Sequence, residues 1–231
     1  MPSKRYKKAL GLVDTTKAYS LANAVELLTK FPKAKFVETI DLAFRLGVDP
    51  KQSDQMVRGT CPLPHGTGKV VKVLVFTKPG AAADAARAAG AEFVGFDDLI
   101  KKCQEGWADF DVAVATPEAM TEVRKLGKVL GPRGLMPNPK TGTVTEDTAK
   151  AVRELKAGRV EFKIDKAGNV HVPVGKSNFT ATQISENART VIEAVHKARP
   201  SSAKGIFVRS ITLSLTMSPP VSIDLREFAN G

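Results

Sequence analysis

The sequence at residues 40–48 is Ile-Asp-Leu-Ala-Phe-Arg-Leu-Gly-Val, and at residues 70–76 it is Val-Val-Lys-Val-Leu-Val-Phe. In the first stretch an apolar residue occupies every second position, which is typical of a strand with one buried face. The second stretch is apolar almost throughout, as expected of a strand that is buried on both faces. The two patterns predict two kinds of sheet in one chain, and 231 residues are enough for two small domains.

Beyond the second stretch, predicted helices and strands alternate. We expect helices at residues 81–89 and 97–105 and strands at residues 92–96 and 111–116. This spacing favours a parallel sheet with helices on its faces, which is a Rossmann-like arrangement. A long loop rich in glycine and proline is expected at residues 127–143, and Thr145 is expected to cap a helix over residues 146–157.

The flanking segments have a different pattern. Ser20 is expected to cap a helix at residues 21–31 that Pro32 ends. The other expected elements are a basic arm at residues 1–10, strands at 55–60, 160–164, 170–174 and 206–215, and a helix at 182–198. The strands at 160–164 and 170–174 are expected to pair with each other through a turn at residues 166–169.

We therefore predict the fold class α/β with two domains. Residues 1–67 and 159–231 form a split α+β domain with an antiparallel sheet, and residues 68–158 form an inserted parallel α/β domain. The alternative is that residues 1–67 form a separate unit. Gly66, Gly68 and Gly158 flank the two crossings, and because glycine tolerates large changes of φ and ψ we predict a hinge there.

Composition and charge restrict the class of protein. No apolar run approaches the roughly 20 residues that span a bilayer, and no apolar run follows the basic N-terminus as in a signal peptide. Cys61 and Cys103 form neither a metal-binding pair nor a disulfide framework, which fits a cytoplasmic protein. The net charge is +11, of which residues 1–67 and 160–231 together hold +8. This charge favours a polyanionic partner, although a basic pI alone can merely aid solubility.

The sequence gives little support for an enzyme. Residues 66–70 resemble the end of a phosphate-binding loop, but Leu63 and Val70 occupy positions that need a glycine and a hydroxyl. The sequence also has no dinucleotide-binding fingerprint and no metal-ligand spacing among its three histidines. We expect no catalytic residue, metal or cofactor. The alternative is an α/β enzyme that binds a phosphorylated small molecule in the middle section.

Three segments carry polar and basic residues at predicted strand ends: residues 33–39, 174–178 and 214–219. If these ends converge, their lysines and hydroxyls form a surface suited to the phosphates and sugars of a shaped RNA. Thr216 and Met217 are expected to make the specific contact, with the Thr216 side chain solvated in the free protein. The alternative is that this pair only closes the core. A loop as long as residues 131–142 is also more often functional than a plain connector.

Several of these segments carry a family resemblance. The run Gly-Pro-Arg-Gly-Leu-Met-Pro-Asn-Pro-Lys at residues 131–140, Lys-Phe-Val-Glu-Thr at 35–39 and Thr-Met at 216–217 closely resemble the bacterial form of the L-one family of large-subunit ribosomal proteins. The resemblance implies a non-enzymatic, two-domain ribosomal protein in the cytoplasm, whose split domain supplies most of the RNA contact. The partners that it implies are the large-subunit ribosomal RNA stalk, exit-site tRNA and the messenger RNA of its own operon, with no membrane partner.

The resemblance also implies a set of RNA-contacting residues. By motif, these are Lys35, Phe36, Glu38, Thr39, Lys176, Ser177, Ser210, Thr216, Met217 and Ser218. The family usually has glycine after the threonine-methionine pair, whereas this chain has Ser218, which places the affinity for RNA in question. A free-standing translational repressor without a ribosomal role is a further alternative.

Overall fold

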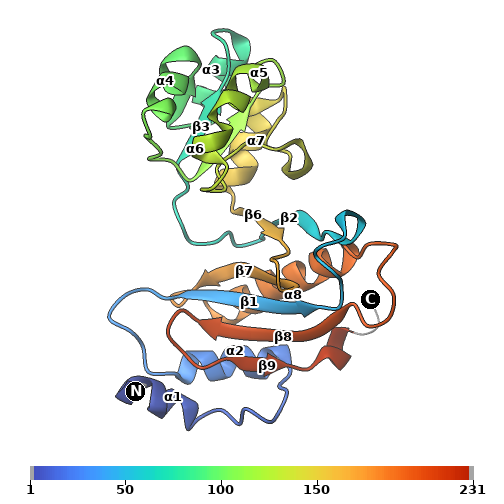
Figure 1. Ribbon diagram of the computed structural model, residues 1–231. Coiled ribbons are helices and arrows are strands. Elements are labelled where there is room, and N and C mark those ends of the chain that lie inside the picture. The colour runs from blue at the N-terminus through green and yellow to red at the C-terminus, as the bar shows by residue number, and fades with distance from the viewer. Residues whose placement is uncertain (1–2, 229–231) are drawn as a thin grey trace. The chain divides into compact units, whose positions relative to one another are not determined.

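The computed structural model describes residues 3–228, apart from the side chain of Lys140. The chain forms two compact units, here called unit 1 and unit 2. Unit 1 comprises Met1–Gly68 and Val160–Gly231, and unit 2 comprises Lys69–Arg159. One sheet of unit 1 is antiparallel and the sheet of unit 2 is parallel, so the predicted fold class is confirmed (Figure 1).

The main sheet of unit 1 has four strands in the order β7-β1-β8-β9. Their bounds are Thr39–Leu46 for β1, Asn169–Lys176 for β7, Val208–Leu215 for β8 and Val221–Ile223 for β9. The central strand β1 pairs antiparallel with β7 on one side and with β8 on the other. Its apolar residues are buried at every second position, as the alternating sequence predicts.

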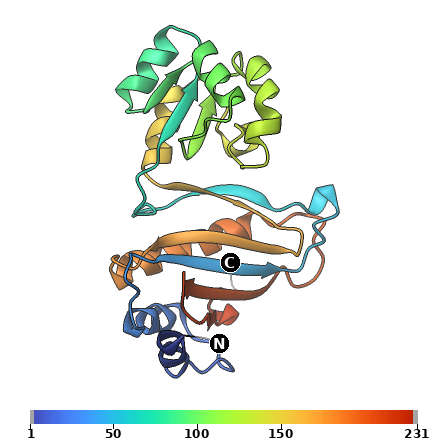
Figure 2. The same cartoon turned by 60° about the vertical axis from the view of Figure 1, so that its left-hand side comes forward.

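Two helices cover one face of this sheet (Figures 1 and 2). α2 spans Leu21–Lys30 and α8 spans Ala181–Lys197, with Ser20 and Thr180 as their N-caps. Thr180 and Gln183 form a capping box, which satisfies backbone groups at both positions. A third helix, α1, spans Lys4–Leu10, where a basic arm was expected. Within unit 1, no described helix packs on the opposite face of the sheet, which we call the open face.

The predicted pairing of residues 160–164 with residues 170–174 is wrong. β6 (Arg159–Lys163) pairs with β2 (Arg58–Pro62), and β7 pairs with β1 instead. The two strands lie close together at Gly59, where an added Cβ would lie only 2.6 Å from the Phe162 ring. Glycine at this position therefore lets β2 approach β6. The predicted strand at residues 55–60 also starts too early, since Ser53–Gln55 form a 3-10 turn.

The sheet of unit 2 has the order β4-β3-β5, with all neighbouring strands parallel. Its strands are β3 (Val73–Phe76), β4 (Phe93–Gly95) and β5 (Val112–Ala115). All four residues of β3 are buried, because successive side chains enter separate cores on the two faces. Val73 and Val75 face α3 (Ala81–Ala88) and α7 (Thr148–Lys156), while Leu74 and Phe76 pack with α4 (Asp97–Gln104).

Two local predictions for unit 2 are wrong. The expected loop at residues 127–143 contains α6 (Gly127–Leu130) and a 3-10 turn at Pro139–Thr141, and α5 (Met120–Val123) precedes it. Helix α7 begins after Asp147, whose carboxylate accepts the N–H of Lys150 at 3.0 Å. Thr145 accepts the N–H of Asp147 at 3.2 Å, so it forms the turn before the cap rather than the cap itself.

A buried asparagine on α8 holds the first crossing segment within unit 1. Asn187 has no exposed surface. Its Nδ2 donates to the carbonyls of Gly66 (3.0 Å) and Val174 (2.8 Å), and its Oδ1 accepts the N–H of His65 (3.1 Å). Gly66, Gly68 and Gly158 all have positive φ, but Gly158 also follows the C-terminus of α7 and Gly66 is fixed by Asn187. The predicted hinge at these glycines stays a prediction.

Replacing Asn187 by alanine should destabilise unit 1 selectively. The change removes three hydrogen bonds to the backbone, of which the one to Val174 is fully buried, so the free energy of unfolding should fall by about 2–4 kcal/mol. Trp107, the only tryptophan, lies in unit 2 and reports on that unit alone. In urea, the circular-dichroism midpoint should fall while the tryptophan fluorescence midpoint stays unchanged. The exposed Asn178→Ala is the matched control, and a fluorescence shift equal to the dichroism shift would contradict this role.

Candidate nucleic-acid interface

The three polar strand ends meet at one end of the antiparallel sheet. Thr39 at the start of β1 pairs with Lys176 at the end of β7, and Ile40 pairs with Leu215 at the end of β8. We call the surface formed by residues 33–39, 176–178 and 216–218 the strand-end surface. The convergence on which the RNA hypothesis depends is therefore present in the fold.

A β-bulge brings Lys176 to the open face. Val170, Val172 and Val174 are buried, and strict alternation would also turn Lys176 toward the core. The register with β1 shifts by one residue between Ile40 and Asp41, which inserts Val174 as an extra residue in β7. As a result Lys176 lies beside Thr39, and its Nζ donates to Thr39 Oγ1 at 2.7 Å.

A second bulge, near the start of β8, also changes which side chains lie on the open face. The register shifts between Arg45 and Leu46, so that Arg209 is the extra residue and Ser210 pairs with Arg45. From there Ser210, Thr212, Ser214 and Thr216 follow one another along the open face, while Ile211, Leu213 and Leu215 are buried. Ser210 therefore shares a face with Thr216 but lies about 20 Å from it along the strand.

Glu38 differs from the other expected contact residues because its side chain is buried. Only 1% of the residue is exposed. Its carboxylate accepts the N–H groups of Ala34 (3.3 Å) and Met217 (3.2 Å) and pairs with the Arg5 guanidinium (3.4 Å). In this position the side chain organises the loops around it, and a direct contact of Glu38 with RNA stays a prediction.

The hydroxyl of Thr216 is engaged in the free protein, contrary to the expectation that it is only solvated. Thr216 Oγ1 accepts the N–H of Thr39 at 3.0 Å and donates to the Thr39 carbonyl at 3.3 Å. The backbone N–H of Thr216 donates to the same carbonyl at 3.0 Å. The residue is nevertheless exposed, so its hydroxyl keeps a lone pair accessible to a ligand.

Serine fits the position where the family usually has glycine. No described residue other than glycine has positive φ, so the backbone at Ser218 needs no glycine. Its Oγ accepts the N–H of Leu215 at 3.0 Å, and its own N–H donates to the Leu215 carbonyl at 3.2 Å. The hydroxyl thus stabilises the turn that presents Met217. Ser177 has a similar role, since its Oγ accepts the N–H of Glu38 at 3.1 Å.

Large apolar side chains are exposed on this surface. Phe36 is 51% exposed, Val37 55% and Met217 55%. Lys35 is exposed beside them. A surface that combines exposed apolar groups, hydroxyls and lysines can contact the sugars, base faces and phosphates of RNA.

Sequence reasoning missed two charged residues at this site. Arg5 lies on α1, 33 positions before Glu38, and the ion pair between them has no local sequence signal. Asp41 lies on the open face between Pro173 and Ser214. Partial burial raises the pKa of Asp41, an effect that the nearby Lys176 and His171 partly offset. Period-two alternation places Asp41 on the open face but gives no reason to select it.

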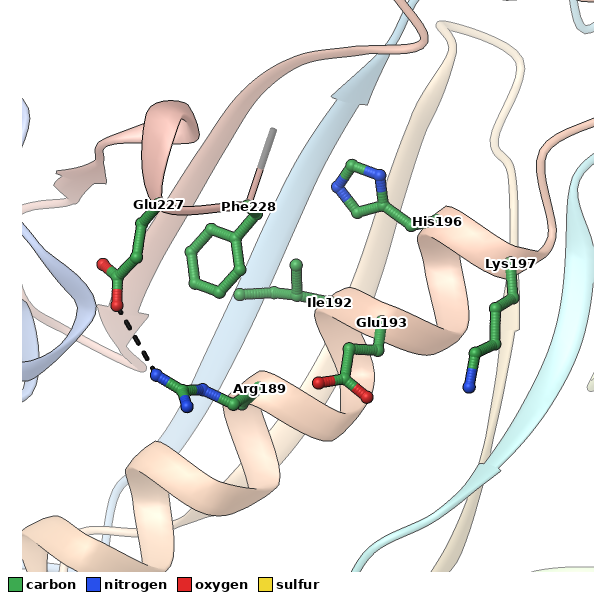
Figure 3. Close-up of a pocket in the computed structure, with 7 residues that line it drawn as sticks. All are labelled: Arg189, Ile192, Glu193, His196, Lys197, Glu227 and Phe228. Atoms are coloured by element: carbon green, nitrogen blue, oxygen red, sulfur yellow. Dashed lines mark ion pairs between the residues drawn. The ribbon is translucent and has the colours of Figure 1, made fainter. Parts of the chain in front are cut away.

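A pocket lies elsewhere in unit 1. It has a volume of about 530 Å³ between α8 and the C-terminal 3-10 helix Leu225–Phe228 (Figure 3). Burial lowers the pKa of His196 there, and Arg199 lowers it further. Figure 3 shows the His196 ring and the Glu193 carboxylate directed to different sides of α8, so they do not form an acid–base pair.

A pocket of about 280 Å³ in unit 2 lies where a ligand of an α/β enzyme would be expected, at the C-terminal ends of β3 and β5. Its charges do not suit a phosphorylated molecule. Lys78 pairs with Glu118 at 3.5 Å, and Glu146 adds a second carboxylate to the lining. Among residues 3–228, no three His, Cys, Asp or Glu side chains are grouped so that they could hold a metal ion. The helices in the same range are too short or too polar to span a bilayer.

A comparison with models of protein families identifies the family of this chain. Residues 28–219, well over half of the chain, match the model of the Ribosomal protein L1p/L10e family. The match includes β1, β7, β8 and the whole of unit 2. This family consists of structural, non-enzymatic proteins of the ribosome. The chain therefore belongs to the Ribosomal protein L1p/L10e family, and it is a ribosomal RNA-binding protein of the large ribosomal subunit.

Proposed function

We propose that the strand-end surface binds the large-subunit ribosomal RNA stalk. The observation that carries this proposal is the convergence of three strand ends, which places Lys35, Lys176, Thr216 and Met217 on one surface. Lysines would contact phosphates, while Thr216 and Met217 would contact sugars or bases. The hydroxyls along β8 extend the surface to Ser210, so one RNA helix can lie across the open face.

The proposal has two further parts that follow from the family resemblance. In the cytoplasm the ribosome-bound protein would contact exit-site tRNA, and the free protein would repress translation of its own operon by binding a similar RNA structure in the messenger. Crosslinking in cells, followed by sequencing of the bound RNA, tests all three partners at once. Reads confined to messenger RNA, with no protein in the ribosomal fractions of a sucrose gradient, would favour a free-standing repressor.

The Thr216 hydroxyl should contribute to RNA binding and, to a lesser extent, to stability. Thr216→Val keeps the shape of the side chain but loses one hydrogen bond to RNA, so binding should weaken roughly 5- to 150-fold. It also removes the acceptor for the Thr39 N–H, so unfolding should become easier by about 0.5–1.5 kcal/mol. Thr216→Ser keeps the hydroxyl and is the control. Binding to stalk RNA that is unchanged in the valine variant would disprove the contact.

The lysine at the mouth of β1 should contribute mainly salt-dependent affinity. Lys35→Ala should make the negative slope of log K against log salt shallower by about 0.7–0.9, because it removes one phosphate contact. Lys101→Ala is the matched control, since Lys101 is an exposed lysine in unit 2. Titration of stalk RNA at several salt concentrations measures both slopes. Equal slopes for the two variants would mean that Lys35 acts only through overall charge.

Asp41 should lower the stability of the free protein at neutral pH. Its pKa is raised by burial, so the ionised form is disfavoured in the fold, and Asp41→Asn should raise the melting temperature at pH 7. As the pH falls through this raised pKa, Asp41 of the parent protein becomes protonated. The difference in melting temperature between the parent and Asp41→Asn should then narrow. A lower melting temperature for Asp41→Asn at pH 7 would show that attraction to Lys176 and His171 dominates instead.

A further inference from the structure

The N-terminal helix α1 is docked against the strand-end surface, although it lies outside the residues that match the family model. Ala9 packs in the core of unit 1, and Arg5 makes the polar contacts of the helix. The Arg5 guanidinium pairs with the Glu38 carboxylate at 3.4 Å and donates to the carbonyls of Met217 (3.2 Å) and Pro32 (3.5 Å). One side chain therefore connects the helix to both loops that present the proposed RNA contacts.

The remaining cations of α1 form a separate face. At 100° per residue, Lys4, Lys7 and Lys8 fall within an arc of about 100°, while Arg5 and Ala9 lie on a neighbouring arc. Ala9 is 3% exposed and faces the core, whereas the three lysines are exposed. The helix contains no acidic residue, and within residues 3–228 none of these lysines forms an ion pair. This face is therefore a concentrated positive charge that the fold itself does not neutralise.

We propose that Lys4, Lys7 and Lys8 of α1 form a phosphate-binding face that extends the strand-end surface along the bound RNA. The proposal rests on the proposed function, since it assigns further contacts to the same RNA. The charge of the face and its continuity with the strand-end surface through Arg5 both favour RNA as the partner. In this arrangement Arg5 positions the helix and the lysines supply affinity that is independent of base sequence.

The test compares two variants that lose the same charge. The variant Lys4→Ala/Lys7→Ala/Lys8→Ala removes the α1 face, and Lys101→Ala/Lys102→Ala/Lys128→Ala removes three exposed lysines of unit 2. Both keep Arg5 and are made in the full-length protein. Alanine favours helix, so neither should impair folding, and thermal melts check this. The probe is a synthetic large-subunit ribosomal RNA stalk, titrated between 0.1 and 1 M salt.

Loss of three phosphate contacts should make the negative slope of log K against log salt shallower by about 2–3 units. Affinity should then fall roughly 100-fold at 0.1 M salt and approach that of the parent near 1 M. The unit 2 variant should keep the parental slope. The proposal would be overturned if the α1 variant kept the parental slope, or if both variants lost the same amount of slope. An acidic protein would then be the better candidate partner of this face. Weaker binding by Thr216→Val would still support the proposed function in that case, because this variant tests the strand-end surface without changing α1.

Discussion

A single buried carboxylate, that of Glu38, holds the proposed RNA-binding surface together. It connects α1, the loop before β1 and the turn after β8 through Arg5, Ala34 and the N–H of Met217. Burying a charge is costly unless it is paired and hydrogen-bonded, so each of these contacts also constrains the segment that supplies it. The exposed groups around it, Phe36 and Met217, are consequently presented on fixed backbone rather than on free loops.

The architecture of the two units could be predicted because burial determines it directly. Strict alternation at residues 40–48 corresponds to one buried face of β1, and the continuous apolar run around Leu74 corresponds to two buried faces of β3. Prediction was less successful where two neighbouring residues could take the same structural role. Thr145 and Asp147 can both cap a helix, and only the three-dimensional contacts of the chain show that Asp147 does so.

The candidate site was predictable only in part. The convergence of the strand ends follows from antiparallel pairing. The side of the sheet on which Lys176 and Ser210 lie depends on bulges at Val174 and Arg209. A bulge reverses the facing of every later residue in its strand, and a single sequence gives no signal for it. Glu38 shows a different limit of sequence reasoning. The family motif selects Glu38 as an RNA contact, yet only the structure shows that its side chain is buried.

The insertion of unit 2 has a consequence for biosynthesis. β1 pairs only with strands that follow it by more than a hundred positions, whereas unit 2 is continuous in sequence. At roughly 5–20 residues per second, translation leaves β1 without its partners for about 5–30 s, during which unit 2 can complete its own fold. In that interval Leu42 and Phe44 lack the part of their core that α8 supplies, and long-range pairing of this kind is slow and exposed to aggregation. The period in which the central strand β1 has no strand partner therefore lasts until the C-terminal third of the chain emerges.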